Sequence, residues 1–255
     1  MRQPGASYRP VAAGALLALL GAAPPLAAQV DVKVTVPTLQ DSRTRIVGSD
    51  RSGGLVLFTK LEGAGVEQAK AFRIRVTGAK DDAGREIPVA SDQEPDWADS
   101  TSDSDLWIKL KSPARDAASV TVTGRLEVFV PSNDPAALVK VENVFARGGK
   151  PLVSPALAAA QLEVAVAPPD TVSEGNFSFV STAAGMERIK GVQVLKRDGT
   201  PVETSFSQSG SDGETAQFIY RLGEPAPPDA GVLFTVLTEK AVVSIPFELK
   251  GLVLP

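Results

Sequence analysis

The stretch from Ser91 to Asp105 gathers acidic residues and contains no basic residue. Clustered carboxylates and backbone carbonyls can together supply the roughly six to eight oxygens that Ca²⁺ takes in proteins. The spacing of its aspartates lacks the Asp-x-Asp-x-(Asp/Asn)-Gly core of an EF-hand, so a calcium site here would be of another kind. Its predicted ligands are Asp96, Asp99, Asp103 and Asp105. The alternative is a long solvated loop, rich in Ser and Asp because nothing packs against it.

Two tryptophans are the next candidates. Trp97 lies inside the acidic loop, and Trp107 lies in a segment where Leu106, Ile108 and Leu110 alternate. This alternation places Trp107 on the outward phase of a strand. An exposed tryptophan beside carboxylates can stack on a sugar ring or anchor a partner protein. We therefore predict ligand or partner contacts for Trp97 and Trp107; for Trp107 the alternative is packing under a neighbouring loop or at the domain interface.

Catalysis has little support in the residue types. The chain has no His and no Cys, which removes the commonest general base and excludes zinc sites built on these residues. It also lacks a Gly-x-Ser-x-Gly elbow and a Ser-x-x-Lys pair. Paired carboxylates, as in glycosidases, remain formally open. We predict a protein that is not an enzyme and has no cofactor other than a calcium ion in the acidic loop.

The first 28 residues have the layout of a signal peptide. Arg2 and Arg9 precede the apolar run from Val11 to Ala23, and small residues follow up to Ala28. This run is too short to span a bilayer comfortably. We predict export to the periplasm or the medium, with no membrane insertion after the signal is removed.

Charge argues against a nucleic-acid partner. Removing residues 1–28 takes two of the 26 basic residues and none of the 30 acidic ones, which leaves 24 − 30 = −6. Nucleic-acid binding needs clustered Lys and Arg, and the chain has no basic run.

Period-2 alternation of apolar residues predicts an all-β fold. Ala71–Thr77 and Ser119–Val130 each place apolar side chains on one face, as half-buried strands do. Many short strands separated by Pro and Gly indicate antiparallel sandwiches. Further strands are expected at Leu55–Thr59, Leu138–Phe145, Leu162–Val166, Phe177–Val180, Val192–Leu195 and Val232–Leu237, with one helical turn at Ala156–Gln161.

Three matches in the same order indicate an internal duplication. Thr123–Pro131 reads like Thr238–Pro246, Asp105–Leu110 like Gln217–Leu222, and the Asp82–Gly84 turn like Asp198-Gly199. A repeat this long is a folding unit, so Val128 and Val243 should occupy equivalent core positions. The consecutive prolines in Ala167–Asp170 mark the expected boundary. We predict domains at 29–167 and 168–255.

The chain also resembles a known group. The segments Ile189–Val194, Phe218–Leu222 and Val242–Leu249 resemble repeat units of exported bacterial proteins with tandem immunoglobulin-like β-sandwich domains. The stretch 126–166, with its Gly148-Gly149-Lys150 turn, is similar to the end of the preceding unit. The resemblance implies two tandem antiparallel immunoglobulin-like sandwiches and carries no site residue.

These observations favour an exported interaction or structural module of the cell envelope that is not an enzyme, with an envelope protein or a glycan as its partner. The alternative is a carbohydrate- or calcium-binding module that uses the loop at 91–105. A third interpretation is a hydrolase based on carboxylates. Calcium-dependent melting would favour the second, and turnover that depends on one Asp or Glu would favour the third.

Overall fold

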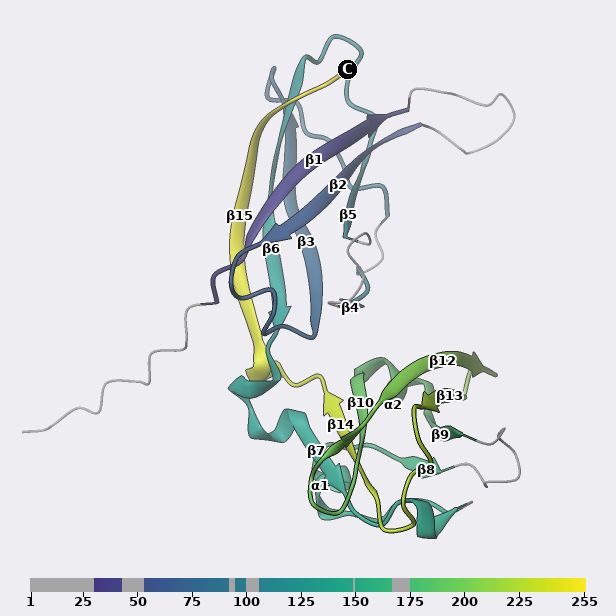
Figure 1. Cartoon of the computed structure of the whole chain (residues 1–255). Helices are drawn as coiled ribbons and strands as arrows, with labels where there is room; N and C mark the ends of the chain where they lie inside the picture. The colour runs from purple at the N-terminus through teal and green to yellow at the C-terminus, as the bar shows by residue number, and fades with distance from the viewer. Residues whose placement is uncertain (1–29, 43–52, 92–94, 100–105, 149, 167–174) are drawn as a thin grey trace, which may run out of the picture.

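Antiparallel strands are the main secondary structure of the described residues (Figure 1). The computed structural model describes residues 30–42, 53–91, 95–99, 106–148, 150–166 and 175–255, so the expected signal segment lies outside it. The helices are short: α1 (Pro155–Ala159), α2 (Ala183–Arg188) and 3₁₀ turns such as η3 (Phe145–Arg147). The predicted all-β sandwich fold is confirmed. Within the described ranges, no helix has the length and apolar character that crossing a membrane requires.

Two sheets enclose a first core, and we call them sheet pair I. One sheet has the order β1 (Lys33–Asp41), β2 (Gly54–Glu62), β5 (Trp107–Lys111). The other has the order β15 (Val242–Val253), β6 (Ser119–Phe129), β3 (Ala71–Asp81), β4 (Ala98–Asp99). The predicted alternation is realised here, because Leu57, Ile108 and Leu126 point inward and are almost fully buried.

Two further sheets enclose a second core, and we call them sheet pair II. One has the order β11 (Pro201–Val202), β10 (Ile189–Leu195), β14 (Gly231–Val236), β7 (Leu138–Val141). The other has the order β12 (Thr204–Ser211), β13 (Thr215–Leu222), β9 (Asn176–Thr182), β8 (Val164–Val166). Phe177, Phe179 and Phe234 are fully buried in the centre of this core.

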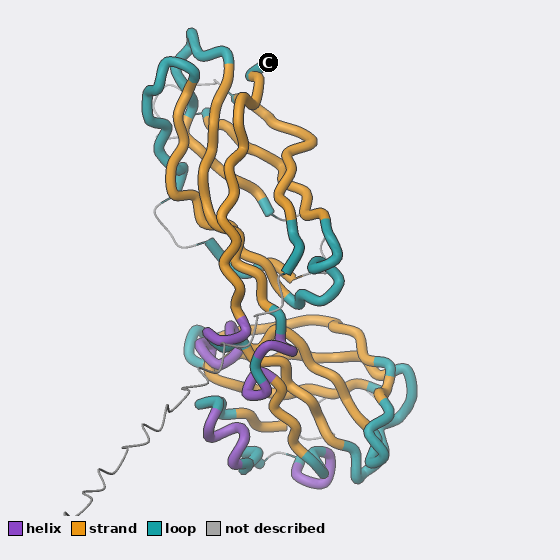
Figure 2. The backbone as a smooth tube through the Cα atoms, turned by 90° about the vertical axis from the view of Figure 1, so that its left-hand side faces the viewer, coloured by secondary structure: helices purple, strands orange, loops and turns teal. Residues whose placement is uncertain are grey.

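The two sheet pairs have the same neighbour relations, and pair II is inserted in the chain between two strands of pair I. The order β1-β2-β5 in pair I corresponds to the order β8-β9-β13 in pair II. The order β15-β6-β3 in pair I corresponds to β7-β14-β10 in pair II. The chain leaves β6 to place β7 beside β14, and it leaves β14 to place β15 beside β6. Pair II is therefore formed by the continuous segment from β7 to β14, which is inserted between β6 and β15 of pair I. Pair I is completed only when the chain returns to it as β15, and Figure 2 shows both passages between the sheet pairs.

The two crossing segments pack against each other. One contains the 3₁₀ turns η1 (Pro131–Asn133) and η2 (Pro135–Ala137), and the other contains η5 (Glu239–Ala241). The backbone N–H of Val130 donates to the carbonyl of Ala241 at 2.9 Å. The Thr238 hydroxyl donates to Asp134 Oδ2 at 2.7 Å, while Asp134 Oδ1 accepts from the N–H of Ala136. These hydrogen bonds hold the two crossing segments against each other between the sheet pairs.

The structure corrects part of the duplication argument. β5 and β13 do occupy corresponding places, and the turns at Gly84 and Gly199 both use the positive φ that glycine allows. Val128 and Val243, however, are direct cross-strand partners in one sheet. Val128 is fully buried and Val243 only partly, so the predicted equivalence of their core positions is wrong. The two segments read alike because they are neighbouring strands with the same alternation.

The sheets also do not divide where the prolines suggested. β8 precedes Ala167, yet it pairs with β9 on the far side of residues 167–174. β15 lies in the segment 168–255, yet its partner β6 lies in 29–167. Residues 167–170 themselves lie outside the described part of the chain.

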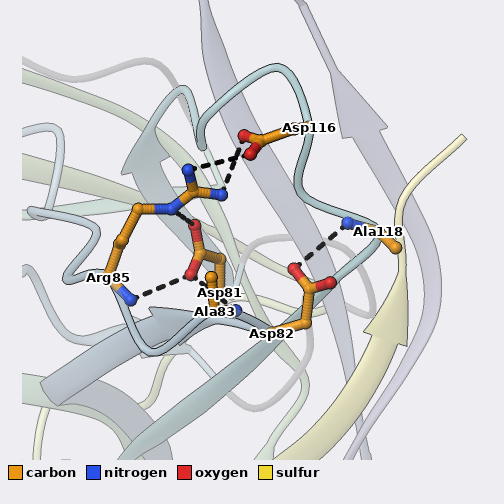
Figure 3. A network of polar contacts seen from close by, with 6 residues as sticks. All are labelled: Asp81, Asp82, Ala83, Arg85, Asp116 and Ala118. Atoms are coloured by element: carbon orange, nitrogen blue, oxygen red, sulfur yellow. Dashed lines mark hydrogen bonds and ion pairs between the residues drawn. The ribbon is translucent and has the colours of Figure 1, made fainter.

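A charged clasp fixes the turn after β3 (Figure 3). The buried carboxylate of Asp81 accepts from the N–H groups of Ala83 and Arg85 at 3.0 and 2.9 Å, and from Arg85 Nε at 2.6 Å. The same guanidinium pairs with Asp116 at 2.8 Å, so it bridges the turn to the segment before β6. Burial acts to raise the pKa of Asp81, but the hydrogen bonds from Arg85 and Ala83 and the charge of Arg85 outweigh it and lower that pKa.

Replacement of Asp81 by Asn is expected to destabilise the fold near neutral pH and to have less effect in acid. A lowered carboxyl pKa gives stability that is present above the unfolded value and lost as the pH falls through the folded value, below about pH 4. Melting temperatures of wild type and Asp81→Asn between pH 7 and pH 3 test this. Arg197→Ala, in the corresponding turn of pair II, is the control, since Arg197 is 87% exposed. Equal losses for Asp81→Asn at both pH values would contradict the clasp.

Candidate functional site

Trp107 lies on the outer face of sheet β1-β2-β5. Its neighbours Ile108 and Leu110 point into the core, and its own side chain is 45% exposed, which confirms the predicted outward phase. Phe58 is its cross-strand partner on β2, and the two rings meet edge to face with centroids 5.8 Å apart. Lys109 Nζ lies 5.0 Å from the centroid of the Trp107 ring.

This arrangement forms a small aromatic and basic surface on a rigid support. The ammonium of Lys109 is attracted to the negative face of the indole, and the contact with Phe58 restricts the rotamer of Trp107. Lys111 is exposed one alternation further along β5, on the same face. We call Phe58, Trp107, Lys109 and Lys111 the Trp107 face. It can offer apolar contact to a partner and positive charge to carboxylates around that contact.

Trp97 lies elsewhere, at the junction between the sheet pairs. It is partly buried and packs against Ala71, Phe129, Ala137 and Ala241, which belong to β3, β6 and the two crossing segments. Its ring also lies under the guanidinium of Arg73, whose Cζ is 4.6 Å from the ring centroid. Trp97 thus contributes to the packing of the junction, and its contact with a ligand or partner stays a prediction.

Arg73 and Arg75 have a partner that the sequence did not indicate. Both donate from Nε to Glu127 on the adjacent strand β6, at 2.6 and 2.9 Å. The guanidinium of Arg73 therefore contacts the ring of Trp97 and forms an ion pair with Glu127. These two arginines stabilise the outer surface of sheet β15-β6-β3-β4.

Charged groups from both sheet pairs approach each other near β4. Asp99 is an exposed residue, but partial burial of its carboxyl raises the pKa of that group, against the attraction of Lys190. Burial lowers the pKa of Lys190 on β10, while Asp99, Glu187 and Asp96 oppose that change. Burial, with Asp99 adding to it, raises the pKa of Tyr220 on β13 to about 12. We call the region where Asp99 of pair I approaches Lys190 and Tyr220 of pair II the seam between the sheet pairs.

The structure describes two of the four predicted calcium ligands. Asp96 and Asp99 are exposed residues at this seam, where the ammonium of Lys190 competes with a metal cation for their charge. Asp103 and Asp105 lie outside the described residues. Within the described ranges, no three Asp or Glu side chains are arranged to hold a metal ion. Calcium binding by Asp96, Asp99, Asp103 and Asp105 stays a prediction.

Several of these contacts differ in how far they could be predicted from the sequence. Lys109 follows Trp107 at i+2, so its position on the same face could have been read from strand periodicity. Phe58 joins the Trp107 face only through the register of β2 against β5. Lys190 and Tyr220 reach Asp99 only because the two crossings set the sheet pairs beside each other, and no local signal marks them. Comparison with protein-family models, curated proteins and solved structures gives no match.

Proposed function

We propose that this chain is an exported binding module of the cell envelope that is not an enzyme, and that it contacts an acidic protein partner through the Trp107 face. The exposed indole of Trp107, with Phe58 against its edge and Lys109 over its ring, carries the proposal. Tryptophan, tyrosine and arginine dominate the residues whose truncation costs most at protein interfaces, and a rigid aromatic side chain loses little conformational entropy on binding.

Charge supports an acidic partner over a basic one. Lys109 and Lys111 lie beside the aromatic pair on β5. Rim charges of one sign speed the encounter with a surface of the opposite sign and suppress wrong partners. The proposed export rests on the signal-like segment 1–28 described above, and the resemblance to exported tandem immunoglobulin-like proteins supports the same location.

The test is affinity capture from native envelope extract with residues 29–255 as bait. Trp107→Ala is expected to lower the captured amount of a specific partner at least tenfold, because hot-spot residues contribute about 2 kcal/mol or more. Lys109→Glu is expected to reduce the captured amount more strongly at low salt than at high salt, because salt screens the charge interaction. Val253→Ala is the control, since Val253 is an apolar side chain that is 72% exposed on another strand. A partner captured equally by all variants would contradict a role for the Trp107 face.

Two other arms separate the remaining candidates. A glycan that binds wild type and not Trp107→Ala would replace the protein partner by a carbohydrate, which can stack on the indole. Loss of every partner on adding a chelator would move the site to the loop at 91–105 and its carboxylates. Either result would overturn the acidic-protein proposal.

A further inference from the structure

Strand β12 is an edge strand without the usual protection. It spans eight residues, Thr204–Ser211, and pairs with β13 along one side only within the described part of the chain. All its residues after Thr204 are exposed, and none of its residues is charged or a proline. Its outer row of backbone N–H and C=O groups is therefore a template for another strand.

Other edges of the described sheets are protected. Natural proteins blunt sheet edges by making them very short or by placing charges and prolines along them. β4 and β11 have two residues each and β8 has three. The longer edge strands carry such residues: Lys33 and Pro37 in β1, Lys109 and Lys111 in β5, Lys140 in β7, and Pro246, Glu248 and Lys250 in β15. β12 alone among these edges has both length and an uncharged sequence.

An apolar side chain stands at this open edge. Phe206 is 57% exposed although it lies on the side of β12 that faces the core. It packs edge to face on Phe218 and Tyr220 of β13, with centroids 5.6 and 5.7 Å away. The facing sheet ends at the two-residue strand β11, so it covers little of this margin. A strand added to β12 would remove the exposed part of the Phe206 ring from water, which is favourable.

The sequence of β12 fits a second copy of itself. Because the strand is uncharged, antiparallel pairing of two copies opposes no like charges. The pairing of β12 with β13 shifts register between Phe206 and Gln208. Because of this shift, Phe206 pairs with Tyr220 and Ser209 pairs with Phe218, so Phe206 and Ser209 lie on the same face of the sheet. With a two-fold axis between Ser207 and Gln208, Phe206 of each copy lies opposite the small side chain of Ser209 in the other, which leaves room for the ring.

We propose that β12 is a self-association edge: two copies of the chain pair antiparallel through Thr204–Ser211 and join their four-stranded sheets into one continuous sheet. This is an isologous two-fold contact, the commonest symmetry of homo-oligomers. The main-chain hydrogen bonds supply affinity, and the Phe206 and Ser209 contact sets the register. The interaction is independent of the Trp107 face, which lies on sheet pair I.

Sedimentation equilibrium of residues 29–255 across the micromolar range tests the proposal. Wild type is expected to form a dimer. Ser207→Lys/Gln208→Lys and Ser207→Glu/Gln208→Glu are each expected to raise the dimer dissociation constant at least tenfold, because like charges then face each other across the axis. An equal mixture of the two variants is expected to dimerise again, and this result also shows that both are folded. Thr38→Lys/Gln40→Lys, on the edge strand β1, is the control and should dimerise as wild type does.

A monomeric wild type would overturn the proposal. It would do so even if β12 were found to bind a strand of another protein. A dimer that both charged variants leave unchanged would overturn it as well, since the contact would then lie elsewhere. Failure of the mixture to dimerise, with both variants melting like wild type, would exclude the two-fold register centred between Ser207 and Gln208.

Discussion

Cutting the chain between residues 167 and 168 is expected to give two segments that do not fold alone. Segment 29–167 keeps β6 but loses β15, which covers the edge of β6 and contributes Leu249 to the first core, and it loses Leu254 directly after that strand. Segment 168–255 keeps β9 and β14 but loses their neighbours β8 and β7. Each segment would therefore expose core and strand edges at once. Thermal melts followed by circular dichroism should show no cooperative transition for either segment.

Mixing the two segments supplies the control. Together the two segments contain every strand. They should therefore associate, because each supplies the strands that pair with the open edges of the other, and the complex should melt cooperatively. A cooperative melt of segment 168–255 alone would show that β7 and β8 are dispensable for the second core, and it would support the predicted boundary at Ala167. The pairing of β7 with β14 and of β8 with β9 would then contribute little to stability.

The strands were the predictable part of the fold. The alternation in Ala71–Thr77 and Ser119–Val130 was visible because each strand has one face in a core and one in solvent. β12 was missed because seven of its eight residues are exposed, which leaves no alternation to read. β1 was not singled out, since Pro37 interrupts it where its pairing with β2 shifts register between Thr35 and Thr38.

The order of the strands in space was not predictable in the same way. Two strands that read alike were interpreted as copies in separate domains, and they are neighbours in one sheet. Local alternation reports which face is buried and contains no information on which edge a strand joins. The same limit applies to the site: the exposure of Trp107 follows from periodicity, whereas the approach of Lys190 to Asp99 depends on the two crossings.

Phe179 is expected to be the most costly side chain of the second core to remove. It is fully buried and contacts four rings, with centroids at 6.0 Å to Phe177, 5.8 Å to Phe218, 6.0 Å to Tyr220 and 5.3 Å to Phe234. Phe179→Ala should lower the free energy of unfolding by about 3–5 kcal/mol, from lost burial and the cavity that remains. Urea unfolding measures this loss, with an unchanged m-value if the two-state transition is kept.

Phe206→Ala, measured at concentrations at which wild type is monomeric, is the matched control, because Phe206 contacts two of the same rings but is 57% exposed. Its removal should cost about 1 kcal/mol or less. Equal costs for the two variants would contradict the assignment of Phe179 to the centre of this core.

Tyr220 gives a second readout of the same packing. Its ring lies parallel to that of Phe179, 11° between planes, and burial raises the pKa of Tyr220 to about 12 from an ordinary 10.0. The chain has two tyrosines, and the other, Tyr8, lies in the expected signal segment. The absorbance of tyrosinate in residues 29–255 therefore reports Tyr220 alone. Phe179→Ala should move this titration toward 10 because it lets water reach the ring, since burial is the main cause of the raised value. A titration that stays at the wild-type value would assign the shift to the carboxylate of Asp99 across the seam.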